Sequence, residues 1–289
     1  MPKDSISKTA QVNLQMLTSL GVPEAVRFSH ALQLQGDPMA LLRHLPLARQ
    51  LPQCISCISE VLYQRANELI LQADNPAILD LACGYSPRVL LMAPRGYTYI
   101  GADLPDVTAD LSARRADILP SNAEWFAGYR TVDVTDQKQM ERVLGALREP
   151  ITVVTQGLLP YLSLSEKRIM ASSIRELLLR DGGCWVLPDV DAKTLVSDTF
   201  GAVLGGVGAG IVGRVNAVQD KLVKRDRSQM TWDSADKIGV ELTDLVFAVR
   251  RVPLYRPGME LRCLDALSKD AAARLLASWE SKSSIVASV

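Results

Sequence analysis

Residues 77–88 read Ala-Ile-Leu-Asp-Leu-Ala-Cys-Gly-Tyr-Ser-Pro-Arg and are the most informative segment of the chain. The apolar run that ends at Ala82 is typical of a buried parallel strand, and Gly84 favours a tight turn into a helix. The small residues Ala82, Cys83 and Gly84 allow the backbone to approach a ligand closely, and the next helix would direct its N–H groups at the same point. The segment therefore predicts a binding site for a polar or charged small molecule.

A second predicted strand, residues 97–103, ends in Asp103. This acid follows Gly84 at about the twenty-residue distance typical of nucleotide-binding sheets, where a carboxylate accepts hydrogen bonds from the ribose hydroxyls. The turn lacks the G-x-G-x-x-G pattern of dinucleotide sites, which disfavours a long pyrophosphate cradle and the oxidoreductases that need one. A nucleoside with a short charged tail fits better, and S-adenosylmethionine is the candidate cofactor.

The composition argues against several classes of partner. The chain has 289 residues with 32 basic and 32 acidic side chains, so no net charge draws it to nucleic acid or to an anionic membrane. The five cysteines form no disulfide framework, and no apolar leader follows Met1. The longest apolar, glycine-rich run, residues 202–213, is too short to span a bilayer. We expect a cytoplasmic protein that acts on a small molecule, with no nucleic-acid or membrane partner and an oligomeric state that the sequence does not reveal.

Two further motifs favour a structural role over chemistry. Cys54 and Cys57 form a C-x-x-C that lacks the second ligand pair of a zinc site and the thioredoxin-like context of a redox site. They lie in an apolar helical stretch, where thiols are usually small buried side chains. His30 and His44 belong to the same helical third of the chain, and we expect neither to act as a base. No metal site is predicted.

Strands and helices alternate from residue 77 onward. This order predicts parallel pairing, right-handed crossovers and an α/β fold with a doubly wound, mostly parallel seven-stranded sheet. The predicted strands are residues 77–82, 97–103, 129–134, 151–156 and 183–187, with an antiparallel pair at 250–255 and 261–267. The predicted helices of this region are residues 87–93, 105–113, 137–148, 165–180, 231–245 and 269–279. The Ser-rich tail from Ser281 is expected to be loose.

The chain divides into two predicted regions. Residues 1–74 are expected to form an N-terminal helical cap, because apolar side chains recur at helical spacing there. Such helices commonly cover the mouth of an α/β sheet and bind the acceptor, although plain packing is the alternative. Residues 75–289 are expected to form the S-adenosylmethionine-binding domain. A glycine-rich insertion at about 194–230 is either a flap or a site of close helix packing.

Polar residues or glycine follow four successive predicted strands. The first strand ends at Gly84, the second at Asp103, the third near Asp133 and the fourth at Gln156. Because the carboxyl ends of parallel strands meet at one edge of a sheet, these four residues are expected to surround one ligand. Their convergence is far more specific than any one of them and predicts a nucleoside site.

Three residues of this edge have more specific expected roles. Asp133 would accept a hydrogen bond from the adenine amino group while the Val134 N–H donates to a ring nitrogen. The alternative is that Asp133 caps the next helix, although Asp136 is the better capping candidate. Tyr161, at the pocket edge, would orient the acceptor or cover the sulfonium with its ring face.

Four segments in this order resemble class I S-adenosylmethionine-dependent methyltransferases: Leu-Ala-Cys-Gly-Tyr-Ser-Pro-Arg, Ala-Asp-Leu-Pro-Asp-Val, Val-Asp-Val-Thr-Asp and Gln-Gly-Leu-Leu-Pro-Tyr-Leu. The chain is most similar to the leucine carboxyl methyltransferase-like branch, which includes bacterial polyketide O-methyltransferases, and the likeness covers residues 77–190 well. The cofactor contacts that this resemblance implies are Ala82 and Gly84 for the methionine part, Asp103 and Leu104 for the ribose, Asp133 and Val134 for the adenine, and Tyr85 and Arg88 in the glycine-loop signature.

The chain departs from the family pattern in two places. Family members usually carry a glutamate, which meets the α-ammonium of the cofactor, where this chain has Gln156. They also carry an arginine in the helix before the first strand that holds the cofactor carboxylate, and Arg49 and Arg65 are only the nearest candidates here. Since a carboxylate keeps a neighbouring amine protonated, the neutral amide of Gln156 makes a free amine more accessible.

These features predict methyl transfer to an oxygen, a carboxylate or a hydroxyl, of a small molecule in secondary metabolism. A carboxylate acceptor needs no general base, which suits a chain without an obvious catalytic histidine. One alternative is an intramolecular cyclisation, in which the cofactor's free amine attacks its own γ-carbon to give azetidine-2-carboxylate and methylthioadenosine, with Gln156 as the deciding residue. The other alternative is a non-catalytic protein that binds the nucleoside.

Overall fold

The computed structural model describes residues 3–34, 50–145, 149–206, 208, 212 and 234–289. Strands in these ranges form one seven-stranded sheet in the order β3-β2-β1-β4-β5-β7-β6. Its strands are β1 (Ala77–Leu81), β2 (Thr98–Asp103), β3 (Phe126–Thr131), β4 (Ile151–Thr155), β5 (Gly183–Leu187), β6 (Ala248–Pro253) and β7 (Ser283–Ser288). β1 to β5 pair in parallel, and β7 runs antiparallel to both β5 and β6. This mostly parallel α/β sheet confirms the predicted fold class.

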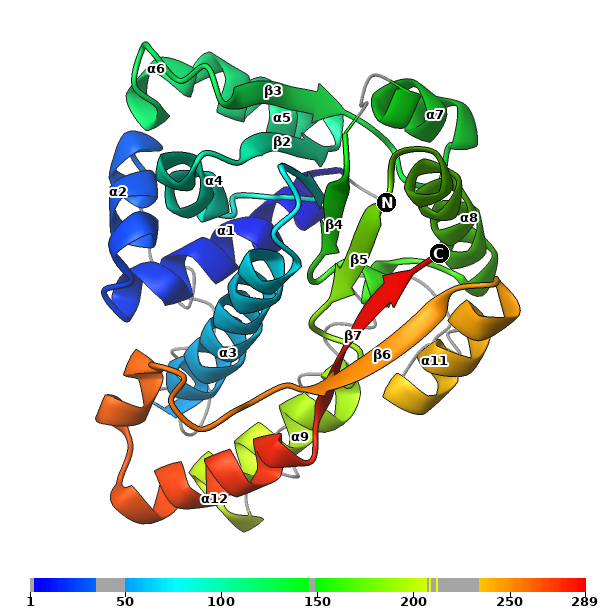
Figure 1. The fold of residues 1–289 in the computed structure, drawn as a ribbon. Coiled ribbons are helices and arrows are strands. Elements are labelled where there is room, and N and C mark those ends of the chain that lie inside the picture. Colours follow the sequence, from blue (N-terminus) through cyan, green and yellow to red (C-terminus); the bar gives the residue numbers. More distant parts are fainter. Residues whose placement is uncertain (1–2, 35–49, 146–148, 207, 209–211, 213–233) are drawn as a thin grey trace.

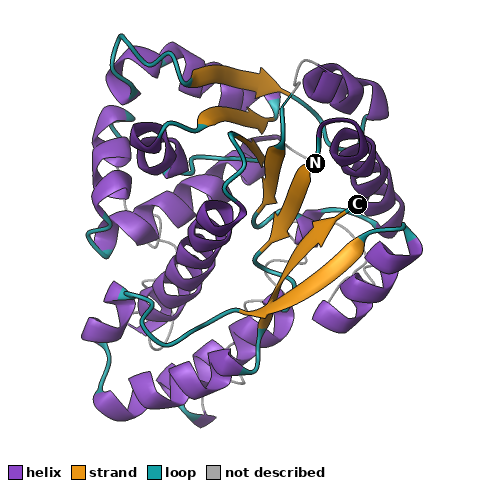
Figure 2. Cartoon of the chain, in the orientation of Figure 1, coloured by secondary structure: helices purple, strands orange, loops and turns teal. Residues whose placement is uncertain are grey.

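Helices cover both faces of the sheet (Figures 1 and 2). One face packs against α7 (Gln137–Gly145), α8 (Leu164–Asp181) and α11 (Ala235–Asp244). The other packs against α1 (Lys3–Ser19), α2 (Pro23–Ala31), α3 (Gln50–Ala73), α4 (Arg88–Met92), α5 (Pro105–Ala113) and α6 (Arg115–Ile118). Within β1, Leu79 faces the first layer and Ile78 the second. Both faces of the strand are therefore buried, which explains its unbroken apolar run.

A third apolar cluster joins the lower end of α3 to α9 (Ala192–Leu204) and α12 (Lys269–Glu280), which lie together in Figure 1. Its centre includes Trp279, which is fully buried. Glu60 of α3 is buried there too, and its carboxylate accepts the N–H groups of Arg262 and Cys263 at 3.0 and 2.7 Å. These N–H groups belong to the start of the short 3-10 helix η5 (Arg262–Ala266), so the buried charge is satisfied by backbone donors.

The predicted strand pairing in the carboxyl-terminal part of the sheet was wrong. Residues 261–267 do not form a strand, since most of them lie in η5. The partner of β6 is β7, which comes from the tail that was expected to be loose. Ile285 and Ala287 are fully buried between β5 and β6, and the Ser284 hydroxyl donates to the Pro188 carbonyl. The tail is ordered because it fills the gap between two strands, a constraint that local composition does not contain.

Most other elements lie close to their predicted positions. β3 is three residues earlier than predicted, so Asp133 follows the strand and does not belong to it. α8 begins at a capping box in which Ser163 and Glu166 bind each other's backbone N–H groups. Of the glycine-rich insertion, residues 192–204 form α9, and most of the remainder lies outside the described residues. The division into a cap (1–74) and a sheet domain (75–289) stays a prediction.

Within the described part of the chain, no helix is both long and apolar enough to cross a membrane.

Candidate functional site

The two central strands, β1 and β4, lie side by side, and the strands that follow them in sequence lie on opposite sides. β2 is next to β1 on one side, and β5 is next to β4 on the other. Open α/β sheets bind ligands at such a switch point, outside the carboxyl ends of the strands. The loops that leave these two strands contain Gly84 and Gln156, so the structure places both predicted residues at the switch point.

The turn after β1 is held to the end of β2. Gly84 has φ +50°, and its N–H donates to Oδ2 of Asp103 at 2.6 Å. The Cys83 N–H donates to the Ala102 carbonyl at 3.0 Å, and Ala82 also has a positive φ, +58°. The predicted close-approach turn and the predicted ribose acid therefore meet directly.

The carboxylate of Asp103 is held by two backbone donors. Besides Gly84 at Oδ2, the Leu104 N–H donates to Oδ1 at 2.7 Å. Leu104 is also the residue before α5, with Pro105 in the first helical position. Burial raises the pKa of the Asp103 carboxyl, and the two N–H donors oppose that rise. The carboxylate is thus fixed in orientation, while each oxygen keeps further acceptor capacity.

Helix α1 lies against the turn at Gly84. A Cβ atom on Gly84 would stand 2.8 Å from the Cβ of Ala10, which is closer than two carbon atoms pack. The next residue, Tyr85, is buried, and its hydroxyl donates to Asp110 of α5 at 2.9 Å. Glycine is therefore required here for space as well as for backbone conformation, and Tyr85 braces the turn against α5.

Arg88, at the start of α4, is buried, and its guanidinium makes four interactions with the described residues. Its Nη1 pairs with Asp80 of β1 at 2.5 Å, and its Nε donates to Oδ1 of Asn67 on α3 at 2.8 Å. The guanidinium carbon lies 5.5 Å from the centre of the Tyr63 ring. The fourth interaction is a hydrogen bond of 2.7 Å from Nη2 to Oε1 of Gln156. The predicted site residues Arg88 and Gln156 are therefore in direct contact.

The contact with Arg88 determines how Gln156 faces the site. Because the carbonyl oxygen of its amide accepts from the guanidinium, the NH₂ group is the part of the amide that Arg88 leaves uncommitted. Arg65, one of the two candidates for holding a cofactor carboxylate, pairs instead with Glu68 at 3.0 Å. Arg49, the other candidate, lies outside the described residues. Arg88 is consequently the guanidinium that the structure places beside Gln156.

Asp133 lies beyond β3 and shapes its own turn. Its Oδ1 accepts from the N–H and the hydroxyl of Thr135 at 2.9 and 2.6 Å. Asp136 accepts from the Gln139 N–H at 3.1 Å and is the cap of α7, as predicted. The Val132 N–H donates to the Asp103 carbonyl at 2.8 Å, so the segment that leads to Asp133 is tied to the end of β2.

Two further predicted site residues, Val134 and Tyr161, come after β3 and β4 in the chain. Val134 is buried next to Asp133. Tyr161 lies in the short 3-10 helix η3 (Leu159–Tyr161), which follows β4 and Gln156. Both therefore belong to loops at the carboxyl edge of the sheet, and their roles toward a ligand stay predictions.

No protein-family model matches the sequence significantly, and no curated protein does either. Among solved structures, the chain is similar to the methyltransferase domain of bacterial CtHen1, with 10% sequence identity and a TM-score of 0.48 over 78% of this chain and 98% of that one. An O-methyltransferase family protein from Burkholderia thailandensis matches with 12% identity and a TM-score of 0.46, over 96% of this chain and 71% of that one. Magnesium protoporphyrin IX methyltransferase from Synechocystis, with bound SAH, matches with 12% identity and a TM-score of 0.45, over 94% and 95%. Likeness at this level does not carry a ligand or an activity over to this chain, so both must be inferred from its own residues.

The sequence analysis missed Asp189, which follows β5. Its Oδ2 accepts the Gly157 N–H at 2.8 Å, and Gly157 directly follows Gln156 with φ +73°. Its Oδ1 is buried and, among the described residues, has no hydrogen-bond partner. Burial raises the pKa of this carboxyl to about 6, opposed by the N–H of Gly157 and by the backbone N–H of Asp189 itself. The sequence does contain a signal for Asp189, because it follows a fifth apolar strand, Cys184 to Leu187. Several of the other candidate residues also lie at the ends of predicted strands.

Asp103 and Asp189 hold the two loops of the switch point in the same way. Asp103 is the last residue of β2, and Asp189 follows β5. Each accepts the N–H of a glycine with positive φ in the loop of the neighbouring strand, Gly84 after β1 and Gly157 after β4. Both oxygens of Asp103 have backbone partners, whereas Oδ1 of Asp189 has no hydrogen-bond partner within the part of the chain that the structure describes. Asp189 therefore has an unused acceptor beside the site.

The C-x-x-C pair lies on α3 and His30 lies on α2. Cys54 and Cys57 are buried and unbridged, and burial raises the pKa of Cys54 to about 12. His30 is exposed at the end of α2, and His44 lies outside the described residues. Among the described residues, no three His, Cys, Asp or Glu side chains are grouped as a metal site would need.

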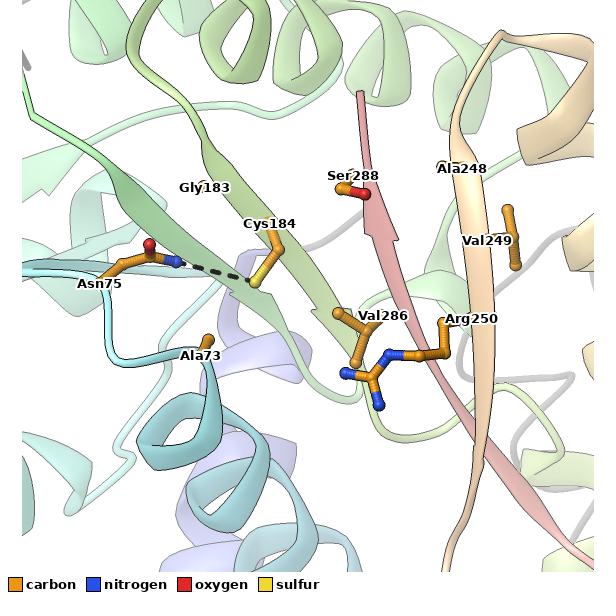
Figure 3. Close-up of a pocket in the computed structure, with 9 residues that line it drawn as sticks. All are labelled: Ala73, Asn75, Gly183, Cys184, Ala248, Val249, Arg250, Val286 and Ser288. Atoms are coloured by element: carbon orange, nitrogen blue, oxygen red, sulfur yellow. Dashed lines mark hydrogen bonds between the residues drawn. The ribbon is translucent and has the colours of Figure 1, made fainter.

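A depression of about 530 Å³ lies at the opposite edge of the sheet, by the first residues of β5 and β6. Figure 3 shows Arg250 beside Val286, and the Asn75 amide directed at the Cys184 sulfur, 3.8 Å away. None of the predicted site residues lines this depression. It is therefore separate from the switch point.

Proposed function

We propose that the chain binds S-adenosylmethionine at the switch point and transfers its methyl group to an oxygen, a carboxylate or a hydroxyl, of a small molecule in secondary metabolism. The observation that supports this most directly is the hydrogen bond of 2.6 Å between the Gly84 N–H and Asp103. It joins a turn that a ligand can approach closely to an acid suited to ribose hydroxyls.

The proposed contacts follow the cofactor from one end to the other. Its methionine part lies against Ala82, Cys83 and Gly84, and its ribose hydroxyls donate to the free lone pairs of Asp103 beside Leu104. Its adenine lies between the segments that follow β2 and β3, with the amino group donating to Asp133 and a ring nitrogen accepting from the Val134 N–H. Tyr85 and Arg88 hold the turn from behind through Asp110 and Asp80.

Methyl transfer is a displacement at a sulfonium carbon. The protein's task is to align the acceptor oxygen with the methyl group at near-attack distance in a water-poor site. A carboxylate acceptor has no proton to lose, so the reaction then needs no base. In this proposal Tyr161 orients the acceptor or covers the sulfonium with its ring.

The contact between Arg88 and Gln156 favours a second candidate, the cyclisation of the cofactor. The amide oxygen of Gln156 is already committed to a guanidinium, and the residue carries no negative charge to hold an ammonium group. An amine placed there is easier to deprotonate. The free amine then attacks the γ-carbon, the carbon–sulfur bond breaks, and its electrons leave with sulfur as methylthioadenosine. The proton lost from nitrogen passes to a base or to water, and azetidine-2-carboxylate is the second product.

The first experiment incubates the purified protein with S-adenosylmethionine alone and identifies the nucleoside product by mass spectrometry. Methylthioadenosine with a new four-carbon amino acid establishes cyclisation, and the Gln156→Glu variant should suppress it. Unchanged cofactor favours methyl transfer, which is then tested by S-adenosylhomocysteine formation with panels of small acids and alcohols. Cofactor binding without turnover in every panel would support the non-catalytic alternative.

The position of the site is tested separately by calorimetry. Asp103→Ala and Asp133→Ala should each abolish measurable binding of S-adenosylmethionine. Asp136→Ala is the matched control, because this acid caps α7 close to the same loop and has no proposed ligand contact. Normal binding by either of the first two variants would show that the site is misplaced.

A further inference from the structure

The ammonium group of the proposed cofactor lacks a partner at position 156. Gln156 is neutral, and its Oε1 already accepts from Nη2 of Arg88 at 2.7 Å. The positive charge of Arg88 is balanced by Asp80, with which it pairs inside the protein, so this pair offers no net negative charge to a ligand. A cationic amine bound near Gln156 therefore needs a carboxylate from another element.

Asp189 is a carboxylate that the structure ties to the loop of Gln156. It is tied by a hydrogen bond of 2.8 Å to Gly157, the residue that follows Gln156 in the chain. The side chain is almost completely buried, with 5% of the residue exposed. Its Oδ1 is out of contact with solvent and has no hydrogen-bond donor among the described residues. Nearly all buried carboxylate oxygens in proteins are paired, so this atom calls for a donor that the described chain does not supply.

Several charged groups on the surrounding segments are engaged elsewhere. Asp191, at the start of α9, accepts the N–H groups of Ala235 and Ser283, each at 2.9 Å. Lys282, before β7, pairs with Asp198 at 2.6 Å. Asp236 of α11 pairs with Arg251. No charged side chain contributes to the raised pKa of Asp189, which arises from burial.

We propose that Asp189 receives the α-ammonium group of S-adenosylmethionine, in the role that a glutamate at position 156 would otherwise have. This inference rests on the proposed cofactor site and adds a residue from β5 to it. A buried carboxylate oxygen without a donor is costly, and an ammonium N–H supplies both a donor and a compensating charge. Because a neighbouring carboxylate keeps an amine protonated, this pairing favours methyl transfer over cyclisation.

The pairing links cofactor affinity to pH. Burial holds the pKa of Asp189 at about 6 in the free protein, and a bound ammonium group lowers it. Ligands that carry the ammonium group therefore bind the form of the protein in which Asp189 is ionised. Their affinity should fall by about tenfold when the pH is lowered from about 7 to about 5. Asp103 also titrates with a raised pKa, but it faces the ribose, which every adenosine ligand carries.

The test compares two ligands by calorimetry across this pH range. S-adenosylhomocysteine carries the ammonium group and cannot donate a methyl group, whereas methylthioadenosine carries the same nucleoside without the amino acid. The affinity for S-adenosylhomocysteine should fall at low pH by about tenfold more than the affinity for methylthioadenosine. This comparison uses the unmodified protein, so it does not depend on the folding of any variant.

Variants test whether Asp189 causes the difference in pH dependence between the two ligands. Asp189→Asn should lower the affinity for S-adenosylhomocysteine by at least about tenfold and leave the affinity for methylthioadenosine unchanged. It should also remove the difference in pH dependence between the two ligands. Adding Gln156→Glu to Asp189→Asn should restore much of the lost affinity, because a carboxylate returns beside the amine. Asp133→Ala is the control for a general loss of the site, since it should abolish measurable binding of both ligands.

Two results would overturn the inference while leaving the proposed function intact. One is an identical pH dependence for the two ligands, and the other is an Asp189→Asn variant that binds both as the unmodified protein does. If neither ligand binds the unmodified protein, the proposed function itself fails and the inference fails with it.

Discussion

Arg88 and Gln156 stand 68 residues apart in the chain and are joined by a hydrogen bond of 2.7 Å. Through this bond and the ion pair with Asp80, one buried guanidinium ties the loop of β4 to β1 and to the first turn of α4. The predicted switch-point site is therefore held together by a charge in the protein interior, and its integrity depends on that charge.

Removal of the guanidinium should destabilise the protein strongly. Arg88→Ala leaves the Asp80 carboxyl at 2% exposure with the Tyr99 hydroxyl, at 2.7 Å, as its one remaining side-chain donor among the described residues. We expect a loss of about 3–5 kcal/mol in the free energy of unfolding, measured by urea denaturation. Arg95→Ala is the control, because Arg95 is exposed and should change stability by less than about 0.5 kcal/mol. Equal losses in the two variants would contradict a buried ion pair at Arg88.

Gly84 and Ala10 should be energetically coupled. Gly84→Ala adds strain at φ +50° and a clash with the Ala10 Cβ at 2.8 Å, for an expected loss of about 2–4 kcal/mol. Gly96→Ala is the matched control, since Gly96 has φ +84° with no atom within 4 Å of an added Cβ. Gly96→Ala should lower the free energy of unfolding only by the backbone strain, about 1–2 kcal/mol.

The clash is isolated by a double-mutant cycle. Ala10→Gly should recover about 1–3 kcal/mol in the Gly84→Ala background beyond its effect in the unmodified protein. Urea denaturation of the four proteins measures this coupling. A coupling energy of zero would show that α1 does not lie on the turn.

Asp189 should make stability depend on pH. Its pKa is raised from 3.8 to about 6 in the folded protein, so the native state holds the proton more tightly than the unfolded chain. The resulting stabilisation is complete below the unfolded pKa and is lost as the pH rises through about 6. Relative to Asp189→Asn, the free energy of unfolding of the unmodified protein should fall by about 3 kcal/mol between about pH 4 and about pH 8. Parallel stability curves for the two proteins would contradict the raised pKa.

The cysteines should be unreactive in the folded protein. All five are free and buried, and burial raises the pKa of Cys54 to about 12, so little thiolate forms at neutral pH. Iodoacetamide should leave the mass of the native protein unchanged and add five groups after denaturation. Rapid labelling of Cys54 or Cys57 in the native protein would revive a redox or metal role for the C-x-x-C pair.

The residues of the candidate site could be predicted where the pattern is local to a strand end. Gly84 and Asp103 were identified from residue type and spacing alone, and the structure joins them directly. Asp189 was missed because its distinguishing property is an unpaired, buried oxygen, which depends on what packs around it. The orientation of the Gln156 amide was likewise unpredictable, since it depends on a guanidinium that comes from a different loop.

The alternation of apolar strands with helices was enough to determine the parallel part of the sheet and the edge at which its polar residues collect. This information is local, because a buried parallel strand must be apolar on both faces and its crossover must be helical. Tertiary structure decided the remainder. β7 exists because the tail completes a sheet between β5 and β6, and the charges of Arg88 and Asp189 take their roles from burial. Burial and pairing between distant segments are properties of the packed chain, so no local pattern contains them.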